Sequence, residues 1–200
     1  LGVELERRRF GQLDRTWSGP EFNRLLGKAM AENRDDFILA RYLGRYAGFR
    51  IHECFRMDTA AAEQALRENA LTVKGKGGKV RTVPIEDERI LMMLKRVLAQ
   101  TERGHKLLVP DGMPTDRAIN ALELFIYRHR NEISDEGSDR RLTFHGLRHT
   151  YAAEKYTRLT EDGMSAIDAH YAVSRLLGHE RADITNIYLA SVRKRGRDGE

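Results

Sequence analysis

The stretch LTVKGKGGKVRTVPI, residues 71–85, decides the fold class because it carries the clearest strand signal in the chain. Two runs rich in β-branched residues, LTVK and VRTVPI, are separated by GKGGK. Such runs around a glycine-rich connection are typical of an antiparallel β-hairpin. The sequence therefore predicts one small antiparallel sheet, with Lys76 presented between two glycines at its tip.

Helical patterns precede the hairpin. Pro20 and Glu21 suit the first turn of a helix, because proline needs no backbone donor there and an acid favours the positive end of the helix dipole. Asp35 or Asp36 can cap a second helix. The segment 58–69 has little β-branching, and we expect either a helix or an irregular connection there.

Helical patterns also follow the hairpin. Apolar residues recur at helical spacing from Asp87 to about Arg103, and Thr115 can cap a further helix. Three helical patterns fill the last quarter, where Ser165 opens a capping box and Gly178 suits a helix end. The predicted fold class is α+β, mainly α: a helical domain with a small antiparallel sheet.

Composition narrows the class of protein. Hydrophobic residues at 40% and charged residues at 32% are typical of a soluble globular protein. No stretch approaches the ~18 apolar residues that a membrane span needs. The single cysteine, Cys54, excludes a disulfide framework and a cysteine-rich zinc site, and it suits a reducing cytoplasm. The opening LGVELERRRF has neither Met nor an apolar signal segment, so we expect a piece of a longer cytoplasmic protein.

Arginine dominates the positive charge. It supplies 27 of the 35 basic residues, and the net charge is +5. Its planar fork binds phosphate through two hydrogen bonds, whereas lysine acts as a point charge. Nucleic acid is therefore a candidate partner, and a solvated surface paired with the 30 acids is the alternative that composition leaves open.

Three groups of residues are candidates for chemistry, and each has an ordinary explanation too. His145 and Arg148 share a helix face that can hold a phosphate, or they are a structural histidine beside a surface arginine. Lys76 can donate a proton from the hairpin tip, or it is a solvated lysine. Tyr188 can be a nucleophile, or it is a core tyrosine of an amphipathic helix.

A metal site has little support. His145 and His149 lie four positions apart, but HGLRH lacks the acid that zinc proteases carry in this motif. The run His52-Glu53-Cys54 leads to no partner histidine. We therefore expect no metal and no other cofactor.

The order of the candidate residues is more specific than any one of them. It resembles the catalytic series of the tyrosine recombinase (phage integrase) family over about residues 16–192. The series comprises Arg50 in AGFRIHE, Lys76 in VKGKGGKVRTVPI, His145 and Arg148 in FHGLRHTYA, His179 in RLLGHE and Tyr188 in ITNIYLAS. The segments HGLRHTYAAE and LLGHERADITNIYLAS are its most specific parts. Two departures are AGFR in place of the usual TGLR, and a longer interval between Arg148 and His179.

The resemblance implies the family's catalytic fold and its chemistry. Tyr188 would attack a DNA backbone phosphate and form a covalent 3′-phosphotyrosine. His145 would accept the phenol proton, and Lys76 would be the general acid for the leaving 5′-oxygen. Strand transfer of this kind needs neither ATP nor a metal.

The resemblance also implies which groups bind the phosphate and the DNA. Arg50 and Arg148 would hold the phosphate oxygens, and His179 would add a hydrogen bond there. Glu53, three positions after Arg50, matches the family's supporting acid. The remaining DNA contacts that we expect come from the hairpin: Lys74, Lys79 and Arg81.

The resemblance predicts three regions, several partners and a role. Residues 1–15 would be a linker from an upstream segment, residues 16–192 the catalytic domain, and residues 193–200 a basic tail. The partner would be double-stranded DNA, bound by a homotetramer on paired sites that is a monomer when free, with no membrane. The protein would be bacterial or phage-encoded and would integrate or excise a mobile element.

Three alternatives remain open. A type IB topoisomerase-like enzyme shares the nucleophile but reseals the same strand. A non-catalytic DNA-binding module would keep the fold and lack cleavage. A helical protein–protein adaptor would not bind duplex DNA at all.

Overall fold

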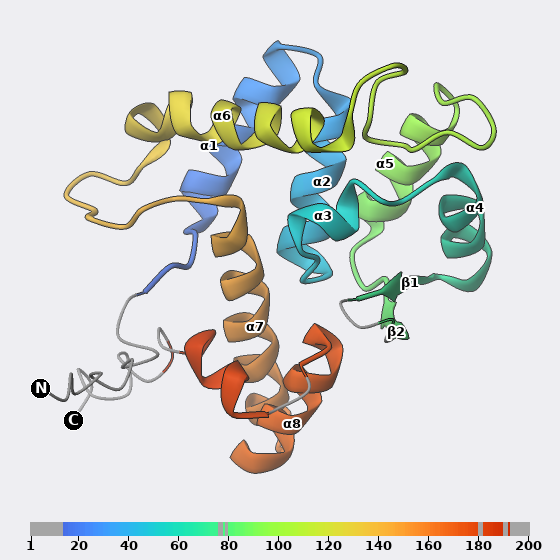
Figure 1. Cartoon of the computed structure of the whole chain (residues 1–200). Helices are drawn as coiled ribbons and strands as arrows, with labels where there is room; N and C mark the ends of the chain where they lie inside the picture. Colours follow the sequence, from blue (N-terminus) through green and yellow to red (C-terminus); the bar gives the residue numbers. More distant parts are fainter. Residues whose placement is uncertain (1–13, 76–77, 79, 180–181, 190–191, 193–200) are drawn as a thin grey trace, which may run out of the picture.

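The computed structural model describes residues 14–75, 78, 80–179, 182–189 and 192 of the chain. Helices make up most of this part, and a two-stranded antiparallel sheet lies at its edge (Figure 1). This arrangement confirms the predicted fold class, α+β, mainly α. Within the described ranges, no helix has both the length and the apolar character needed to cross a membrane.

From residue 14 onward, where the structure describes the chain, four helices precede the hairpin: α1 (Gly19–Ala31), α2 (Asp35–Tyr46), α3 (Ile51–Cys54) and α4 (Thr59–Glu68). The predicted start of α1 is confirmed, because the Ser18 hydroxyl accepts from the Glu21 backbone N at 3.1 Å and the Glu21 carboxylate accepts from the Ser18 backbone N at 2.9 Å. The predicted cap of α2 is wrong by one residue. Arg34 precedes that helix without a side-chain cap, and Asp35 already lies in its first turn.

The segment left open in the sequence is helical. Asp58 caps α4, since its carboxylate accepts from the Ala61 backbone N at 2.8 Å. The hairpin follows as β1 (Ala70–Lys74) and β2 (Val80–Pro84), which pair antiparallel with Val73 opposite Arg81. Lys76, Gly77 and Lys79 of the tip lie outside the described residues.

The second half consists of α5 (Glu88–Leu98), α6 (Thr115–Ile133), α7 (Phe144–Glu161), α8 (Ala166–Leu177) and the 3₁₀ turn η2 (Ala182–Ile187). Helix α5 ends at Leu98, earlier than the apolar pattern predicts. Thr115 is the first residue of α6 rather than its cap. The end of α8 is confirmed, because Gly178 adopts a left-handed conformation with φ of 65°.

Among the described residues, two hydrophobic clusters build the interior. Helix α7 runs from the preceding helices to α8 and so links the two clusters (Figure 1). The larger cluster joins the preceding helices and the sheet to Phe144 and Leu147 in the first turn of α7. The smaller cluster comprises Tyr151, Ala152, Val173, Leu177, Tyr188 and Leu189. The stretch of α7 between the two clusters carries Arg148, which places this residue where the two parts of the interior meet.

The segment before α1 lies against α7. The backbone N of Trp17 donates to Thr150 Oγ1 at 2.8 Å, and the Trp17 indole donates to the Thr143 carbonyl at 2.9 Å. A Cβ on Gly146 would come within 2.5 Å of the Arg15 carbonyl oxygen, so this approach requires glycine. Residues 1–13 lie outside the described part, and the linker boundary at residue 15 stays a prediction.

Candidate active site

Helix α7 positions two of the predicted residues, His145 and Arg148. Thr143 caps the helix, and the two residues follow three positions apart on one face. Arg148 is fully buried, whereas His145 is exposed. The same helix face therefore reaches from the interior to the surface.

The guanidinium of Arg148 binds backbone oxygens from two distant segments. Its Nη1 donates to the Gly48 carbonyl, and its Nη2 donates to the Leu177 carbonyl at 2.6 Å. Its Nε has no hydrogen-bond partner among the described residues. Burial, followed by the charge of Arg50, lowers the Arg148 pKa to about 10, so the group stays protonated at neutral pH.

Gly48 must be glycine for this contact. Its φ is 65°, a left-handed conformation that other residues rarely adopt. A Cβ there would lie 2.5 Å from Cδ1 of Tyr151. The backbone before α3 can therefore bring its carbonyl to Arg148 only without a side chain at this position.

His179 connects Arg148 to the segment that carries Tyr188. Its Nε2 lies 3.2 Å from Arg148 Nη2, and its Nδ1 lies 2.9 Å from Oγ1 of the buried Thr185. A guanidinium only donates, so Nε2 accepts and the proton resides on Nδ1, which donates to Thr185. Burial, then the charge of Arg148, lowers the His179 pKa to about 3.

Tyr188 follows η2, and its ring lies among aromatic and cationic groups. The ring centroid is 4.4 Å from that of His149, 4.9 Å from that of His179 and 5.4 Å from that of His145. The Arg148 Cζ atom lies 5.5 Å from the same centroid. Only 7% of Tyr188 is exposed. The structure therefore places three other predicted site residues, His145, Arg148 and His179, around the Tyr188 phenol, although the interval between Arg148 and His179 is long.

The imidazole of His145 is neutral at neutral pH. Although the residue is exposed, desolvation beside its neighbours, followed by the charge of Arg148, lowers its pKa to about 4. A neutral imidazole can accept a proton. Its position beside Tyr188 suits the proton-acceptor role that the sequence predicts.

Glu53 joins α3 to the hairpin. Its carboxylate accepts from the backbone N of Arg50 at 2.7 Å, from Arg50 Nη1 at 3.1 Å, and from both terminal nitrogens of Arg81 at 2.8 and 2.7 Å. Burial opposes ionisation, but the hydrogen bonds and charge of Arg81 outweigh it and hold the Glu53 pKa at about 2. The buried carboxylate therefore keeps Arg50 beside the site.

The predicted DNA-binding residues of the hairpin differ in their surroundings. Arg81 is bound to Glu53 with 9% of its side chain exposed, so the structure gives it an internal partner. Lys74 is exposed on β1. Lys76 and Lys79 lie outside the described residues. Contact of Lys74, Lys79 and Arg81 with DNA, and the general-acid role of Lys76, stay predictions.

The comparisons with known proteins agree with this geometry. Residues 24–195 match the model of the phage integrase family. The chain belongs to the phage integrase family. This confirms the resemblance that the order of the site residues indicates.

Individual relatives of this phage integrase family member are distant. The tyrosine recombinase XerD of Pseudomonas putida is 29% identical over 130 residues, which cover 62% of this chain and 39% of XerD. The XerA recombinase structure has a TM-score of 0.63 and 21% identity over 92% of this chain and 65% of its own. The Tn1549 transposon integrase, solved with transposon right end DNA, has a TM-score of 0.62 and 15% identity over 98% of this chain and 69% of its own. The chain thus spans about two fifths of XerD and two thirds of XerA.

Sequence analysis of this integrase family member did not find every residue at the site. The sequence pattern indicates His149 only as a possible metal ligand, and it gives no signal for Thr185. Arg81 is predicted as a DNA contact of the hairpin, and no pattern indicates its partner Glu53, which is 28 positions away. The four-residue spacing of His145 and His149 is the one available signal, because it places both rings on the same helix face.

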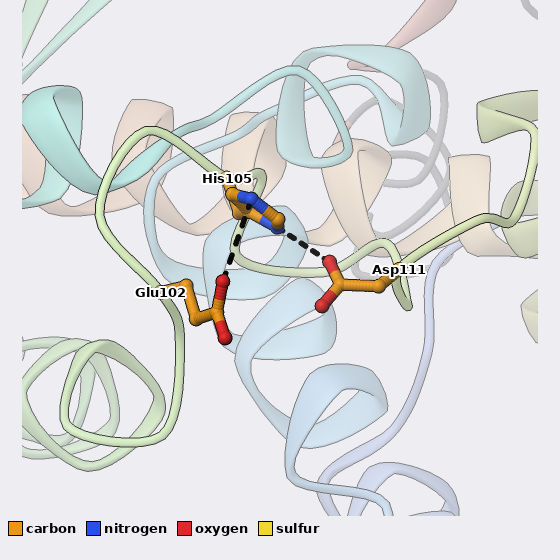
Figure 2. Close-up of side chains that lie close together, drawn as sticks. All are labelled: Glu102, His105 and Asp111. Carbon is orange, nitrogen blue, oxygen red and sulfur yellow. Dashed lines mark hydrogen bonds and ion pairs between the residues drawn. The ribbon is translucent and has the colours of Figure 1, made fainter.

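A separate group of titratable side chains lies on the loop between α5 and α6 (Figure 2). His105 Nδ1 lies 2.5 Å from Asp111 Oδ1, and His105 Nε2 lies 3.8 Å from Glu102 Oε2. Their ligand atoms lie within 4.8 Å of one another, but all three side chains are exposed and already pair with each other. We assign no metal to this group.

Proposed function

We propose that this chain is the catalytic domain of a site-specific DNA recombinase that cuts and rejoins strands through a covalent 3′-phosphotyrosine. The observation that carries the proposal is the position of Tyr188, whose ring lies against His145, His149 and His179 and beside the Arg148 guanidinium. A phenol beside a neutral proton acceptor and a buried cation has the surroundings of a nucleophile that attacks phosphate.

The first step is an attack on phosphorus by Tyr188 Oη. An oxygen–phosphorus bond forms and the bond from phosphorus to the 5′-oxygen breaks. A tyrosine normally keeps its proton up to pH ~10, so an acceptor is needed at neutral pH. We assign His145 as the acceptor because its neutral imidazole lies beside the Tyr188 ring, and the negative charge of a bound phosphate would raise its low pKa towards the range that a base needs. Lys76 supplies the proton that the leaving 5′-oxygen needs.

Two arginines bind the phosphate while negative charge builds on its oxygens. The buried Nε of Arg148 has no hydrogen-bond partner among the described side and main chains, so the guanidinium keeps one uncommitted donor. Arg50 has 28% of its side chain exposed and is oriented by Glu53. Phosphoryl transfer depends mainly on positioning and electrostatic stabilisation, so fixed guanidinium groups can stabilise the transition state without a metal.

His179 holds the arrangement together, and its proposed hydrogen bond at the phosphate requires Nε2 to release Arg148 and carry the ring proton. It bridges Arg148 and Thr185, so the guanidinium and the turn before Tyr188 move as one unit. The reverse reaction completes strand exchange. A 5′-hydroxyl from a partner duplex attacks phosphorus and gives its proton to Lys76, the bond from phosphorus to Tyr188 Oη breaks, and His145 returns a proton to the released phenol.

Strand exchange needs two duplexes and one active site for each strand that is cut. We therefore propose a homotetramer on paired double-stranded DNA sites, assembled from subunits that are monomers when free. Its role would be to integrate or excise a mobile element in the cytoplasm of a bacterium. The Tn1549 transposon integrase was solved with transposon right end DNA, and the XerH recombinase was solved bound to a palindromic difH substrate, which supports a DNA substrate for this chain.

The test is to trap the covalent adduct. The protein is incubated in EDTA with a library of nicked suicide duplexes that have a randomised centre, and the modified residue is identified by mass spectrometry. We expect an adduct on Tyr188, its loss in Tyr188→Phe with DNA binding kept, and its persistence in the matched control Tyr171→Phe. Tyr171 is 54% exposed and lies on α8, away from the phenol cluster.

The other outcomes decide between the alternatives. DNA binding without any adduct would support a non-catalytic module, and loss of the adduct in EDTA would support a metal mechanism. Relaxation of supercoiled DNA without a partner site would support a topoisomerase-like enzyme. Failure to bind duplex DNA at any salt concentration would support an adaptor.

A further inference from the structure

His149 has no part in the steps above, yet its ring is the one nearest to the Tyr188 ring among the three histidines. The two centroids are 4.4 Å apart and the planes are inclined by 26°, which is a stacked pair. The rings of His179 and His145 lie farther from the phenol, at 4.9 and 5.4 Å. The phenol therefore rests on the face of His149.

His149 also contacts the proposed proton acceptor. Its ring meets the His145 ring edge to face, with centroids 5.0 Å apart and planes at 84°. These two histidines lie four positions apart on α7, so the helix backbone sets their separation. One imidazole thus touches both the proposed nucleophile, Tyr188, and its proposed base.

His149 is buried, and its ring packs against one face of the Tyr188 ring. Only 2% of the residue is exposed, and its Nε2 has no hydrogen-bond partner in the described part of the chain. Burial, followed by electrostatic interaction with His145, Arg15 and Arg148, lowers the His149 pKa to about 3, so the ring is uncharged at neutral pH. Because Nε2 bonds to none of these groups, what His149 offers Tyr188 is the flat face of its ring.

We propose that His149 is a positioning residue, whose buried ring stacks on Tyr188 and holds the phenol beside His145 for attack on phosphate. The proposal rests on the function proposed above. A reaction is faster when the attacking group is held in line with its target. Displacing that group by about 1 Å can lower the reaction rate ~100-fold. An aromatic ring at position 149 should therefore suffice, whereas a small or flexible side chain should not.

The first test measures the stack without DNA. The protein is labelled with 3-fluorotyrosine, and Tyr188→Phe assigns the Tyr188 fluorine resonance. We expect His149→Ala to move that resonance downfield because the ring current of the imidazole is lost, and His149→Phe to leave it near its original position. An unchanged resonance in His149→Ala overturns the proposal.

The second test measures the rate of adduct formation on a nicked duplex recovered from the library. We expect His149→Ala and His149→Gln to slow single-turnover adduct formation ~10- to 100-fold with unchanged DNA affinity, and His149→Phe to restore most of the rate. Full rate in His149→Ala, or rescue by Gln and not by Phe, overturns the proposal.

Thr150→Ala is the matched control for a purely structural effect. Thr150 is a buried neighbour on α7 whose hydroxyl accepts from the Trp17 backbone N. We expect this variant to lower the melting temperature yet keep the rate of adduct formation. If both alanine variants slow the reaction in proportion to their loss of stability, the role of His149 is structural and the proposal fails.

The two proposals fail separately. If wild-type protein forms no adduct, the proposed function fails and the positioning role falls with it. If wild type forms the adduct on Tyr188 and His149→Ala equals its rate, only the positioning role falls.

Discussion

The histidines around Tyr188 and the histidine of the α5–α6 loop have opposite surroundings. Burial and the charge of nearby arginines lower the pKa values of His149 and His179 to about 3. His105 is exposed, and its hydrogen bond to Asp111 and the charge of that acid raise its pKa (Figure 2). The protonation state of a histidine is therefore set by its neighbours in space, and the site keeps its imidazoles neutral beside cationic arginines.

The largest difference between the Tyr188 site and the α5–α6 loop should appear in the rate of adduct formation. We expect His145→Ala to slow adduct formation ~10²- to 10⁴-fold, the usual contribution of a positioned acid or base. His105→Ala should keep the wild-type rate, because the exposed loop does not belong to the site. Single-turnover assays on one nicked duplex compare the two variants. Equal rates would remove His145 from the role of proton acceptor.

The next difference between the two regions is how much a carboxylate in each contributes to the free energy of unfolding. Glu53→Ala leaves Arg50 and Arg81 facing each other without their shared buried acid, and we expect a loss of ~3 kcal/mol in the free energy of unfolding. Asp111→Ala should leave the urea midpoint unchanged, because exposed ion pairs contribute little. Urea unfolding of both variants measures this. A similar loss in both would contradict the assignment of Glu53 as the buried link.

Acid should destabilise the fold through its buried histidines. The unfolded chain takes up protons near the ordinary pKa of 6.5, whereas folded His149 does so only near 3. Stability should therefore decrease as the pH falls from 6.5 towards 3, by up to ~1.4 kcal/mol per pH unit for each such group. Urea unfolding at a series of pH values should show a smaller decrease for His149→Phe. An equally steep decrease in this variant would show that His149 is not kept neutral.

The contribution of His105 to stability should depend on pH with the opposite sign to that of His149, and it should be the smallest of the expected effects. Its raised pKa means that its contribution to stability is fully present below 6.5 and is lost as the pH rises through the raised value. Salt should screen the exposed pair, so NMR titration should show the His105 pKa returning towards 6.5 as sodium chloride is added. The resonances of His149 and His179 should not titrate near pH 6.5 at any salt concentration.

Local signals in the sequence predicted much of the fold. Pro20, Ser165 and Gly178 lie at helix ends as expected, because helix starts and ends depend on residues a few positions apart. The caps expected from Asp35 and Thr115 were wrong by one position, since several polar residues can begin a helix at nearly the same place.

The site could be predicted only in part. The order of its residues resembles the family's series, and the structure places His145, Arg148, His179 and Tyr188 together. The partners of these residues depend on contacts between distant segments, such as Gly48 with Arg148, 100 positions apart. No periodicity or spacing reports such contacts.

The double pairing of Glu53 has an evolutionary consequence. One buried acid pairs with the arginine just before α3 and with another on the hairpin, so a lineage that loses it leaves two arginines without their shared acid at once. A single later substitution cannot repair both. Positions 50, 53 and 81 should therefore vary together or not at all among descendants of this sequence.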